Sequence, residues 1–308
     1  MAPLAPTRAE GREVADAVVA WWVSSAVRRE RDRLAWRVRR EPWRVLVSEV
    51  MLAQTQLGRV EAHFEPFLAR FPSPSALASA RLAEVLSCWS GLGYPRRAVA
   101  LRRAASVLVD EHAGQVPCSY RELRALAGVG DYTARAVMAF AFDAPVMPVD
   151  TNVARVLARA VAGRPLGRGR SQEVADSLVD GARRGRRRAQ AVMDLGATLC
   201  RPSPSCDRCP LAPASGRPAC AWRAGGVGAD PAEGTFGSSR RQSPFEGSDR
   251  QGRGRLLRAA AARPVAPAEL AVAAGWPGDP ARAERVARTL VADGLLEGQP
   301  EGGYRLPR

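Results

Sequence analysis

Lysine is missing from this 308-residue chain, so all 46 of its basic side chains are arginines. Without lysine, catalysis through a lysine Schiff base is excluded. The arginines still produce a formal net charge of +15, which attracts a polyanion such as nucleic acid or an anionic membrane surface. A compositional bias toward arginine gives the same charge, so charge alone does not identify the partner.

Long apolar runs are absent as well. Residues 1–14 contain charges and prolines but lack the apolar stretch of a signal peptide, and no later segment is apolar enough to span a bilayer. We therefore expect a cytoplasmic protein with no membrane partner. Its six cysteines should then be reduced, and the four that cluster between Cys200 and Cys220 indicate a metal site rather than disulfides.

The sequence also lacks sustained strand alternation, and its apolar residues recur at helical spacing from about residue 12 to residue 160. The first two thirds of the chain should therefore be all-α. Residues 225–254 are rich in Gly, Ser and Arg, which is the composition of a linker. Beyond them we expect three short helices and a Gly-turned hairpin, at residues 255–262, 267–274, 281–295 and 296–306. That order resembles a winged helix, although a small stabilising cap without DNA contact fits it equally.

A turn with two glycines, Gly128 and Gly130, joins two expected helices. Ser119 and Glu122 form a capping box that starts the first of these helices. The glycines allow backbone N–H groups to converge on one phosphate at the start of the second. This is a helix-hairpin-helix signature and it favours DNA binding, although glycine in such a turn also serves purely steric ends.

A carboxylate lies inside the helix expected at residues 42–52, which a proline opens. Glu49 has Val45, Leu52 and Ala53 at helical spacing around it, so it belongs to an apolar stripe. Burial there should raise its pKa, and a proton held near neutral pH makes a general acid. A buried glutamate paired with an arginine in the core is the alternative.

A second carboxylate, Asp150, precedes a helical pattern at residues 151–157 and occupies its N-cap position. Backbone N–H groups and the helix dipole should keep Asp150 ionised, the opposite bias from that on Glu49. A protonated acid and a fixed anion are the pair that cleavage of a bond at a sugar carbon requires. Helix capping alone also explains an aspartate here, and the pairing with Glu49 is what favours catalysis.

Four cysteines follow the helical run at residues 192–199 in a C-x5-C-x2-C-x10-C pattern. The thiolates of Cys200, Cys206, Cys209 and Cys220 suit either an iron-sulfur cluster or structural zinc. The spacing does not separate these two metals.

Five short motifs together resemble those of MutY-type adenine DNA glycosylases, within the helix-hairpin-helix superfamily of endonuclease III-like fold. They are LAWR at 34–37, SEVMLAQTQ at 48–56, GLGY at 91–94, VDTN at 149–152 and MDLGA at 193–197. The resemblance covers roughly residues 12–222. It implies an all-α, two-lobed glycosylase with a cluster lobe, followed by the small winged-helix-like domain. The implied parts are a cluster domain at 7–25 and 146–222, a six-helix domain at 26–145, a linker at 223–250 and the last domain at 251–308.

The resemblance also implies roles for individual residues. Glu49 would protonate adenine as the leaving group and Asp150 would stabilise the oxocarbenium-like sugar, with support from Tyr132 and Asn152. The adenine pocket and the opposing-base contacts would come from Leu34, Trp36, Arg37, Gln54, Thr55, Leu92 and Tyr94. In this comparison Gln54 and Tyr94 wedge into the duplex, and Gly128 and Gly130 contact the DNA backbone.

The same resemblance implies a 4Fe-4S cluster on the four cysteines and double-stranded DNA with an adenine mismatch as substrate. Adenine must be extruded, because its glycosidic bond is unreachable inside stacked DNA. We expect a monomer that is associated with the bacterial nucleoid when it is on DNA.

A lyase of the endonuclease III type is the nearest alternative, and it needs a lysine. The family comparison puts that lysine at the position of Tyr132, which favours a monofunctional hydrolase. A non-catalytic DNA-binding protein that keeps the clamp and the cluster is a further alternative, against which the Glu49 and Asp150 pair argues.

The chain departs from the family pattern in three places. Ala53 replaces the first glutamine of the usual Gln-Gln-Thr, and the cysteine intervals differ from the common ones. The residues after Cys220 are too few and too helical for the β-rich domain with which many members recognise 8-oxoguanine. Preference for that opposing base is therefore less secure than adenine excision.

Overall fold

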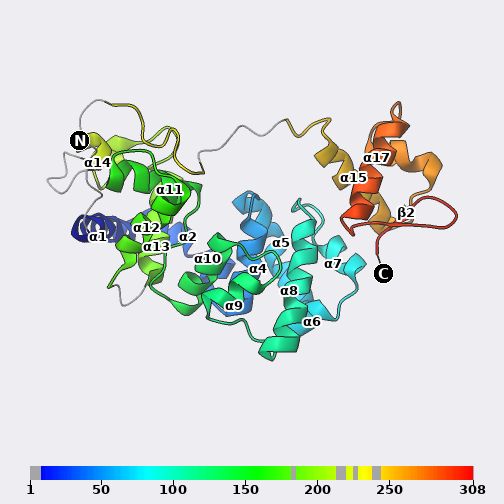
Figure 1. Ribbon diagram of the computed structural model, residues 1–308, viewed down its shortest axis with the longest axis horizontal. Helices are drawn as coiled ribbons and strands as arrows, with labels where there is room; N and C mark the ends of the chain where they lie inside the picture. The colour runs from blue at the N-terminus through cyan, green and yellow to red at the C-terminus, as the bar shows by residue number, and fades with distance from the viewer. Residues whose placement is uncertain (1–7, 182–184, 213–219, 225–227, 238–243, 308) are drawn as a thin grey trace. The chain divides into compact units, whose positions relative to one another are not determined.

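The computed structural model describes residues 8–181, 185–212, 220–224, 228–237 and 244–307. In these residues the chain is mostly helical, and its strands form one small two-stranded sheet near the C-terminus (Figure 1). The all-α expectation is confirmed. No helix in the described part of the chain has both the length and the apolarity needed to cross a membrane.

The chain divides into two compact units that alternate along the sequence. Unit 1 consists of Met1–Val45, Cys118–Arg124 and Val129–Arg240, and unit 2 of Leu46–Pro117, Ala125–Gly128 and Arg241–Arg308. Helix α4 (Pro42–Leu52) begins in unit 1 and ends in unit 2. The lobe boundaries expected from the sequence remain a prediction.

Unit 1 contains most of the helices that follow residue 118. Its elements are α1 (Arg8–Ser24), α2 (Ala26–Arg31), α3 (Ala35–Val38), α9 (Tyr120–Ala125), α10 (Asp131–Phe142), α11 (Thr151–Val156), the π-helix η1 (Leu157–Ala162), α12 (Arg168–Val179), α13 (Gly185–Thr198), the 3-10 helix η2 (Cys206–Arg208) and α14 (Ala221–Ala224). Helix α1 packs on α12 and α13, and α11 packs on α13 and η1. Fully buried apolar side chains such as Val18, Leu178 and Val192 form this core.

A polar cluster is buried in the same core. Trp22 donates its indole N–H to Asp194 Oδ2 at 2.8 Å, and Arg37 donates to both Asp194 oxygens at 2.8 Å. Asp194 is only 1% exposed. A buried charge is tolerated where it is paired and hydrogen-bonded, and the bidentate ion pair with Arg37 meets both conditions for Asp194.

Unit 2 contains two groups of elements. The first is α5 (Leu57–Arg70), α6 (Pro74–Ala78), α7 (Leu82–Cys88) and α8 (Arg96–His112). Helix α8 packs on α6 and α7, and the rings of Phe67 and Trp89 meet edge to face with centroids 5.7 Å apart. Both aromatic side chains are at most 1% exposed, so they belong to the centre of this group.

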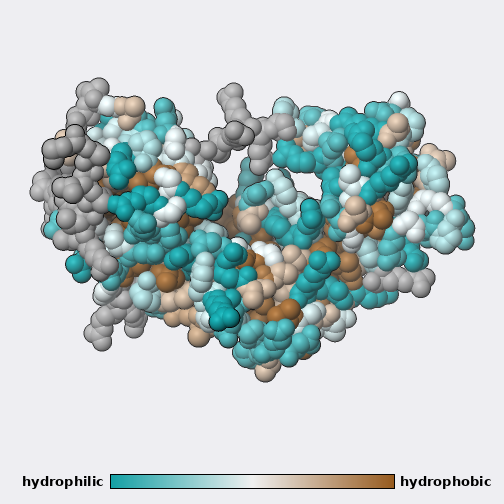
Figure 2. All heavy atoms as spheres, viewed as in Figure 1, coloured by the Kyte–Doolittle hydropathy of each residue, from teal (hydrophilic) through white to brown (hydrophobic). Residues whose placement is uncertain are grey.

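The second group is the C-terminal part of the chain. It consists of α15 (Asp249–Ala262), the 3-10 helix η4 (Pro267–Glu269), α16 (Leu270–Ala274), α17 (Pro280–Ala292), β1 (Glu297–Gly298) and β2 (Tyr304–Arg305). The strands pair antiparallel with Glu297 opposite Arg305, and Val265 bridges to Tyr304. This is the element order of a winged helix, as the sequence predicts. On the face shown in Figure 2, most of its described surface is hydrophilic.

Residues 228–237 pack against η1 and the residues that follow it, although their composition is that of a linker. Asp230 forms an ion pair with Arg159 of η1, and Phe236 donates its N–H to Leu166 O at 2.8 Å. The Arg168 guanidinium lies 4.0 Å from the centroid of the Phe236 ring. A few specific contacts therefore fix a segment that has few large apolar side chains.

Candidate functional site

Glu49 lies in the second half of α4. The helix begins at Pro42, as expected for a residue that lacks an N–H and has a preset φ. Glu49 is 5% exposed, and Val45 one turn earlier is 2% exposed. The predicted burial of this carboxylic acid is confirmed, and its role as a general acid stays a prediction.

Asp150 caps the N-terminus of α11. Its φ of −94° and ψ of −174° are extended, and its carboxylate accepts hydrogen bonds from Val153 N at 2.7 Å and Asn152 Nδ2 at 2.9 Å. The predicted N-cap is confirmed. Its hydrogen bonds lower the pKa of Asp150, as expected, but burial outweighs them and raises the pKa overall, so the ionised state of Asp150 stays a prediction.

A chain of hydrogen bonds runs from Asp150 to the first cysteine. Asn152 accepts from Arg155 Nη2 at 2.8 Å, and Arg155 Nε donates to Cys200 O at 2.6 Å. Arg155 Nη2 also donates to Gly196 O at 2.8 Å. Glycine is required at position 196, since a Cβ there would lie 2.7 Å from Asn152 O. The VDTN and MDLGA motifs therefore meet at this point.

The four cysteines line one cavity. Leu199, Leu211 and Trp222 contribute apolar lining to it. Burial, together with the other three thiols, raises the pKa of Cys209 to about 11. Among the described residues no group of three or more His, Cys, Asp or Glu side chains is already arranged to hold a metal ion.

Arg159 connects this cavity to the segment at 228–237. It lies in η1, is 1% exposed, and donates to Cys200 Sγ at 3.5 Å and to Arg201 O at 2.6 Å. Asp230 accepts from Arg159 Nε at 2.8 Å and thereby pairs the buried charge. Sequence reasoning missed Arg155, Arg159 and Asp230, since nothing local distinguishes them from other charged residues of the chain.

Two turns in unit 2 carry the residues expected to contact the opposing base. Gln54 has a φ of 61° and Tyr94 a φ of 47°, so both adopt the left-handed conformation that non-glycine residues rarely take. The two turns are joined directly, because Thr55 Oγ1 donates to Leu92 O at 3.1 Å. Gln54 and Tyr94 are exposed, whereas Leu92 is 1% exposed.

The remaining predicted residues lie in unit 1 or at the hairpin. Leu34 and Trp36 are buried, and the guanidinium of Arg37 is engaged by Asp194. Tyr132 is half-buried in the first turn of α10. Since Glu49 belongs to unit 2 and Asp150 to unit 1, the pairing of these carboxylates in one site stays a prediction.

The expected hairpin is present between α9 and α10. Gly128 has a φ of +77°, and a Cβ there would lie 2.7 Å from the Cβ of Ala100, so only glycine fits. Gly130 is the N-cap of α10, and a Cβ at Gly130 would meet nothing within 4 Å. The first glycine is required by the turn, and the second leaves open space at a helix N-terminus.

Known proteins match the sequence along nearly the whole chain. An adenine DNA glycosylase of Mycobacterium tuberculosis is 42% identical over 305 residues, which cover 96% of this chain and 94% of that protein. The chain belongs to the adenine DNA glycosylase family. A second relative, from Mycolicibacterium smegmatis, is 41% identical over 86% of this chain and 87% of its own length. The human adenine DNA glycosylase is 41% identical over 59% of this chain and 36% of its own length.

The fold comparison agrees with membership of the adenine DNA glycosylase family. The family model of HhH-GPD superfamily base excision DNA repair proteins matches residues 47–174. Endonuclease III in a non-covalent DNA complex has a TM-score of 0.55 at 25% identity, covering 66% of this chain and 92% of that one. A thermostable thymine-DNA glycosylase has a TM-score of 0.60 at 24% identity, covering 70% and 98%. The chain is therefore a base excision repair enzyme with an endonuclease III-like fold.

Proposed function

We propose that this enzyme hydrolyses the N-glycosidic bond of adenine mispaired with 8-oxoguanine or guanine in double-stranded DNA, and that it does so as a monofunctional monomer. The observation that carries the proposal is the surroundings of two carboxyl groups. Glu49 is buried on an apolar stripe of α4, whereas Asp150 is held by an N–H of its own helix and by Asn152.

The chemistry follows from these two positions. Glu49 donates its proton to a ring nitrogen of the extruded adenine, and the C–N bond breaks as the base leaves with the bonding electrons. The Asp150 carboxylate then lies next to an oxocarbenium-like sugar, whose positive charge it stabilises. A water molecule adds to the sugar carbon and releases a proton to solvent, from which Glu49 is protonated again, and the products are an abasic site and free adenine.

Monofunctional chemistry is supported by the composition of the chain. Cleavage of the strand by a lyase needs an amine that forms a Schiff base with the opened sugar. The sequence contains no lysine. Tyr132, at the start of α10, is the residue at the position where the family resemblance implies the lysine of a lyase. The abasic strand should therefore stay intact until alkali is added.

The residues around the reaction take the roles that the family resemblance implies. Tyr132 and Asn152 support the carboxylates, and Leu34, Trp36 and Arg37 line the adenine pocket. Gln54 and Tyr94 enter the duplex beside the opposing base, with Thr55 and Leu92 behind them. Gly128 and Gly130 bring backbone N–H groups to a phosphate.

The cysteine cavity fits a 4Fe-4S cluster. Cys200, Cys206, Cys209 and Cys220 all line it, its other lining is largely apolar, and two guanidinium groups lie 3.5 Å from Cys200 Sγ and Cys206 Sγ. Such donors suit an anionic, sulfur-rich group. When bound, the cluster supplies cross-links between the segments before and after residue 210. Iron and acid-labile sulfide analysis tests this assignment, and stoichiometric zinc without sulfide would contradict it.

The catalytic assignment is tested by Glu49→Gln with Glu61→Gln as a matched control. Glu61 is an exposed glutamate on the next helix, α5, so its replacement makes the same chemical change at a different position. With a duplex that contains adenine opposite 8-oxoguanine, Glu49→Gln should bind and release no adenine, whereas Glu61→Gln should behave as wild type. Normal release by Glu49→Gln would overturn the role of Glu49. A wild-type protein that shifts the duplex in a gel but liberates nothing would be a DNA-binding protein only.

A further inference from the structure

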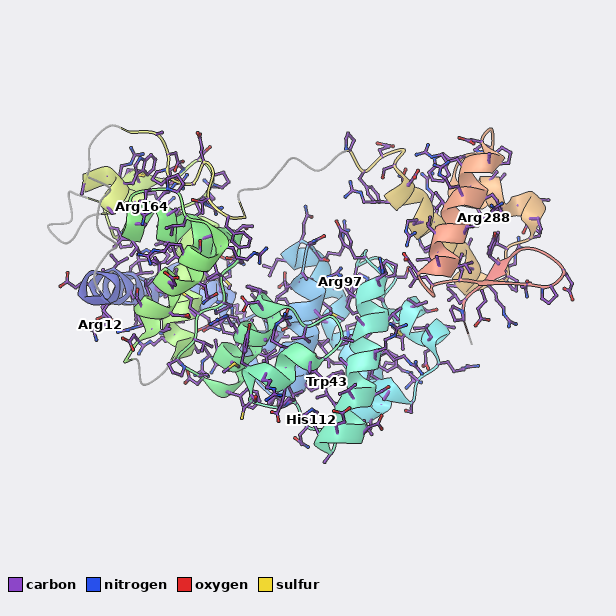
Figure 3. All side chains as sticks on the ribbon, in the orientation of Figure 1. Arg12, Trp43, Arg97, His112, Arg164 and Arg288 are labelled. Carbon is purple, nitrogen blue, oxygen red and sulfur yellow. The ribbon has the colours of Figure 1, made fainter. Side chains whose placement is uncertain are left out.

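Arg97 holds the end of the helix that carries Glu49. It projects from the first turn of α8 and is labelled in Figure 3. Its Nη1 atom donates to the carbonyl oxygens of Val50 at 2.7 Å, Met51 at 2.9 Å and Ala53 at 2.5 Å. The last carbonyls of a helix lack partners within the helix, and they carry the negative end of its dipole. The Arg97 cation therefore caps the C-terminus of α4.

The other nitrogen of the same guanidinium reaches both DNA-facing turns. Arg97 Nη2 donates to Thr55 Oγ1 at 2.8 Å, to Gly93 O at 3.0 Å and to Leu92 O at 3.3 Å. One planar group thus joins three pieces of chain: the end of α4, the turn at residues 53–55 and the turn at residues 92–94. A guanidinium suits this task, since its donors form a rigid fork.

Aromatic rings fix the plane of this guanidinium. Its central carbon lies 5.4 Å from the ring centroids of both Trp89 and Tyr94, within the range of cation–π attraction. Trp89 itself donates its indole N–H to Gly93 O at 3.0 Å. Burial lowers the pKa of Arg97 to about 10, so the group is still a cation at neutral pH.

The turns that Arg97 joins present two strained residues. Gln54 and Tyr94 both have positive φ values, 61° and 47°, and each is exposed. Such conformations persist only where the surrounding structure holds them, and they concentrate at functional sites. Arg97 donates hydrogen bonds to both turns. It bonds to Ala53 and Thr55 on either side of Gln54, and to Gly93 directly before Tyr94.

We propose that Arg97 is a positioning residue for adenine excision, which sets the helix of the general acid in register with the two turns that hold the opposing base. The inference rests on the proposed function, because it uses the roles assigned there to Glu49, Gln54 and Tyr94. In this role Arg97 does not contact the substrate. It acts through the backbone of the residues that do.

The test compares Arg97→Lys and Arg97→Ala with Arg103→Lys and Arg103→Ala. Arg103 is an exposed arginine on the same helix, so its variants control for charge and for substitution in α8. Lysine keeps the charge at position 97 but lacks the two Nη groups with which the guanidinium reaches the end of α4 and the two turns. Because misplacement by about 1 Å costs roughly a hundredfold in rate, Arg97→Lys should excise adenine about 10 to 100 times more slowly at saturating enzyme. The Arg103 variants should match wild type.

Two readouts separate positioning from a merely structural role. Free guanidinium ion should restore part of the excision rate of Arg97→Ala, whereas sodium chloride at the same ionic strength should not. Amide hydrogen exchange in Arg97→Lys should rise together at residues 53–55 and 92–94 and stay unchanged elsewhere. Exchange that rises throughout the chain, or in one turn alone, would overturn the proposal, and so would a wild-type excision rate in Arg97→Lys.

The exchange measurement also keeps the two proposals apart. A wild-type enzyme that releases no adenine would remove the proposed function. The paired rise in exchange at the two turns would still show that Arg97 couples them, and its absence would remove the inference as well.

Discussion

At Asp150, one side chain does two things that oppose each other. Its hydrogen bonds from Val153 and Asn152 fix the carboxylate at the start of α11, yet burial raises its pKa. Burial of ionised Asp150 therefore destabilises the folded state. The catalytic role proposed for Asp150 accounts for this cost, since a buried anion next to a sugar stabilises a developing cation most strongly.

This cost predicts a pH dependence of stability. A carboxyl whose folded pKa lies above its unfolded value favours the folded state below the unfolded value and loses that contribution as pH rises through the folded one. Compared with Asp150→Asn, the wild-type enzyme should therefore lose stability as pH rises above the ordinary value of 3.8. Thermal melts of both proteins from acid to neutral pH measure the difference. Parallel curves would contradict the raised pKa.

At the scale of elements, the sequence predicts best what local chemistry decides. The bounds of α4, the N-cap of α11 and the hairpin between α9 and α10 follow from proline, aspartate and glycine at positions where each has a specific backbone role. The order of the C-terminal elements follows from apolar periodicity and glycine in the same way.

What the sequence does not predict depends on partners that are distant along the chain. In the π-helix η1 each hydrogen bond spans one residue more than in an α-helix. The apolar periodicity of the sequence does not reveal this difference. Residues 228–237 have the composition of a linker, and their packing depends on the ion pair between Asp230 and Arg159. The direction of the pKa shift of Asp150 depends on how deeply tertiary packing buries it. The tasks of Arg97 and Arg155 depend on carbonyls from other segments.

The hairpin gives a prediction at the element scale, from two glycines with different tasks. Gly128→Ala should destabilise the fold by about 1–3 kcal/mol, because its φ is +77° and the new Cβ would meet Ala100. Gly130→Ala should change stability little, since a Cβ there meets nothing within 4 Å. It should nevertheless weaken DNA binding, because the methyl group occupies space where a phosphate would approach the N-terminus of α10. Chemical denaturation and DNA titration measure the two effects, and unchanged affinity of Gly130→Ala would contradict the proposed phosphate contact.

At the scale of the whole molecule, a net charge of +15 carried by arginine without lysine favours contact with the DNA backbone. Counterion release then makes affinity depend on salt. If the enzyme contacts about six phosphates, its affinity for duplex DNA should fall roughly a thousandfold between about 50 and 200 mM salt. Binding measured by fluorescence anisotropy over that range tests this, and an affinity that does not change with salt would show that the charge serves another purpose.

Adenine excision without strand cleavage is the central claim, and one single-turnover experiment tests it most directly. Wild-type enzyme in excess is mixed with a duplex that contains one adenine opposite 8-oxoguanine, and free base and strand length are measured in the same sample. The account predicts one adenine released per duplex and a strand that breaks only after alkali. An intact duplex that has released no base, or a strand that breaks without alkali, would contradict it.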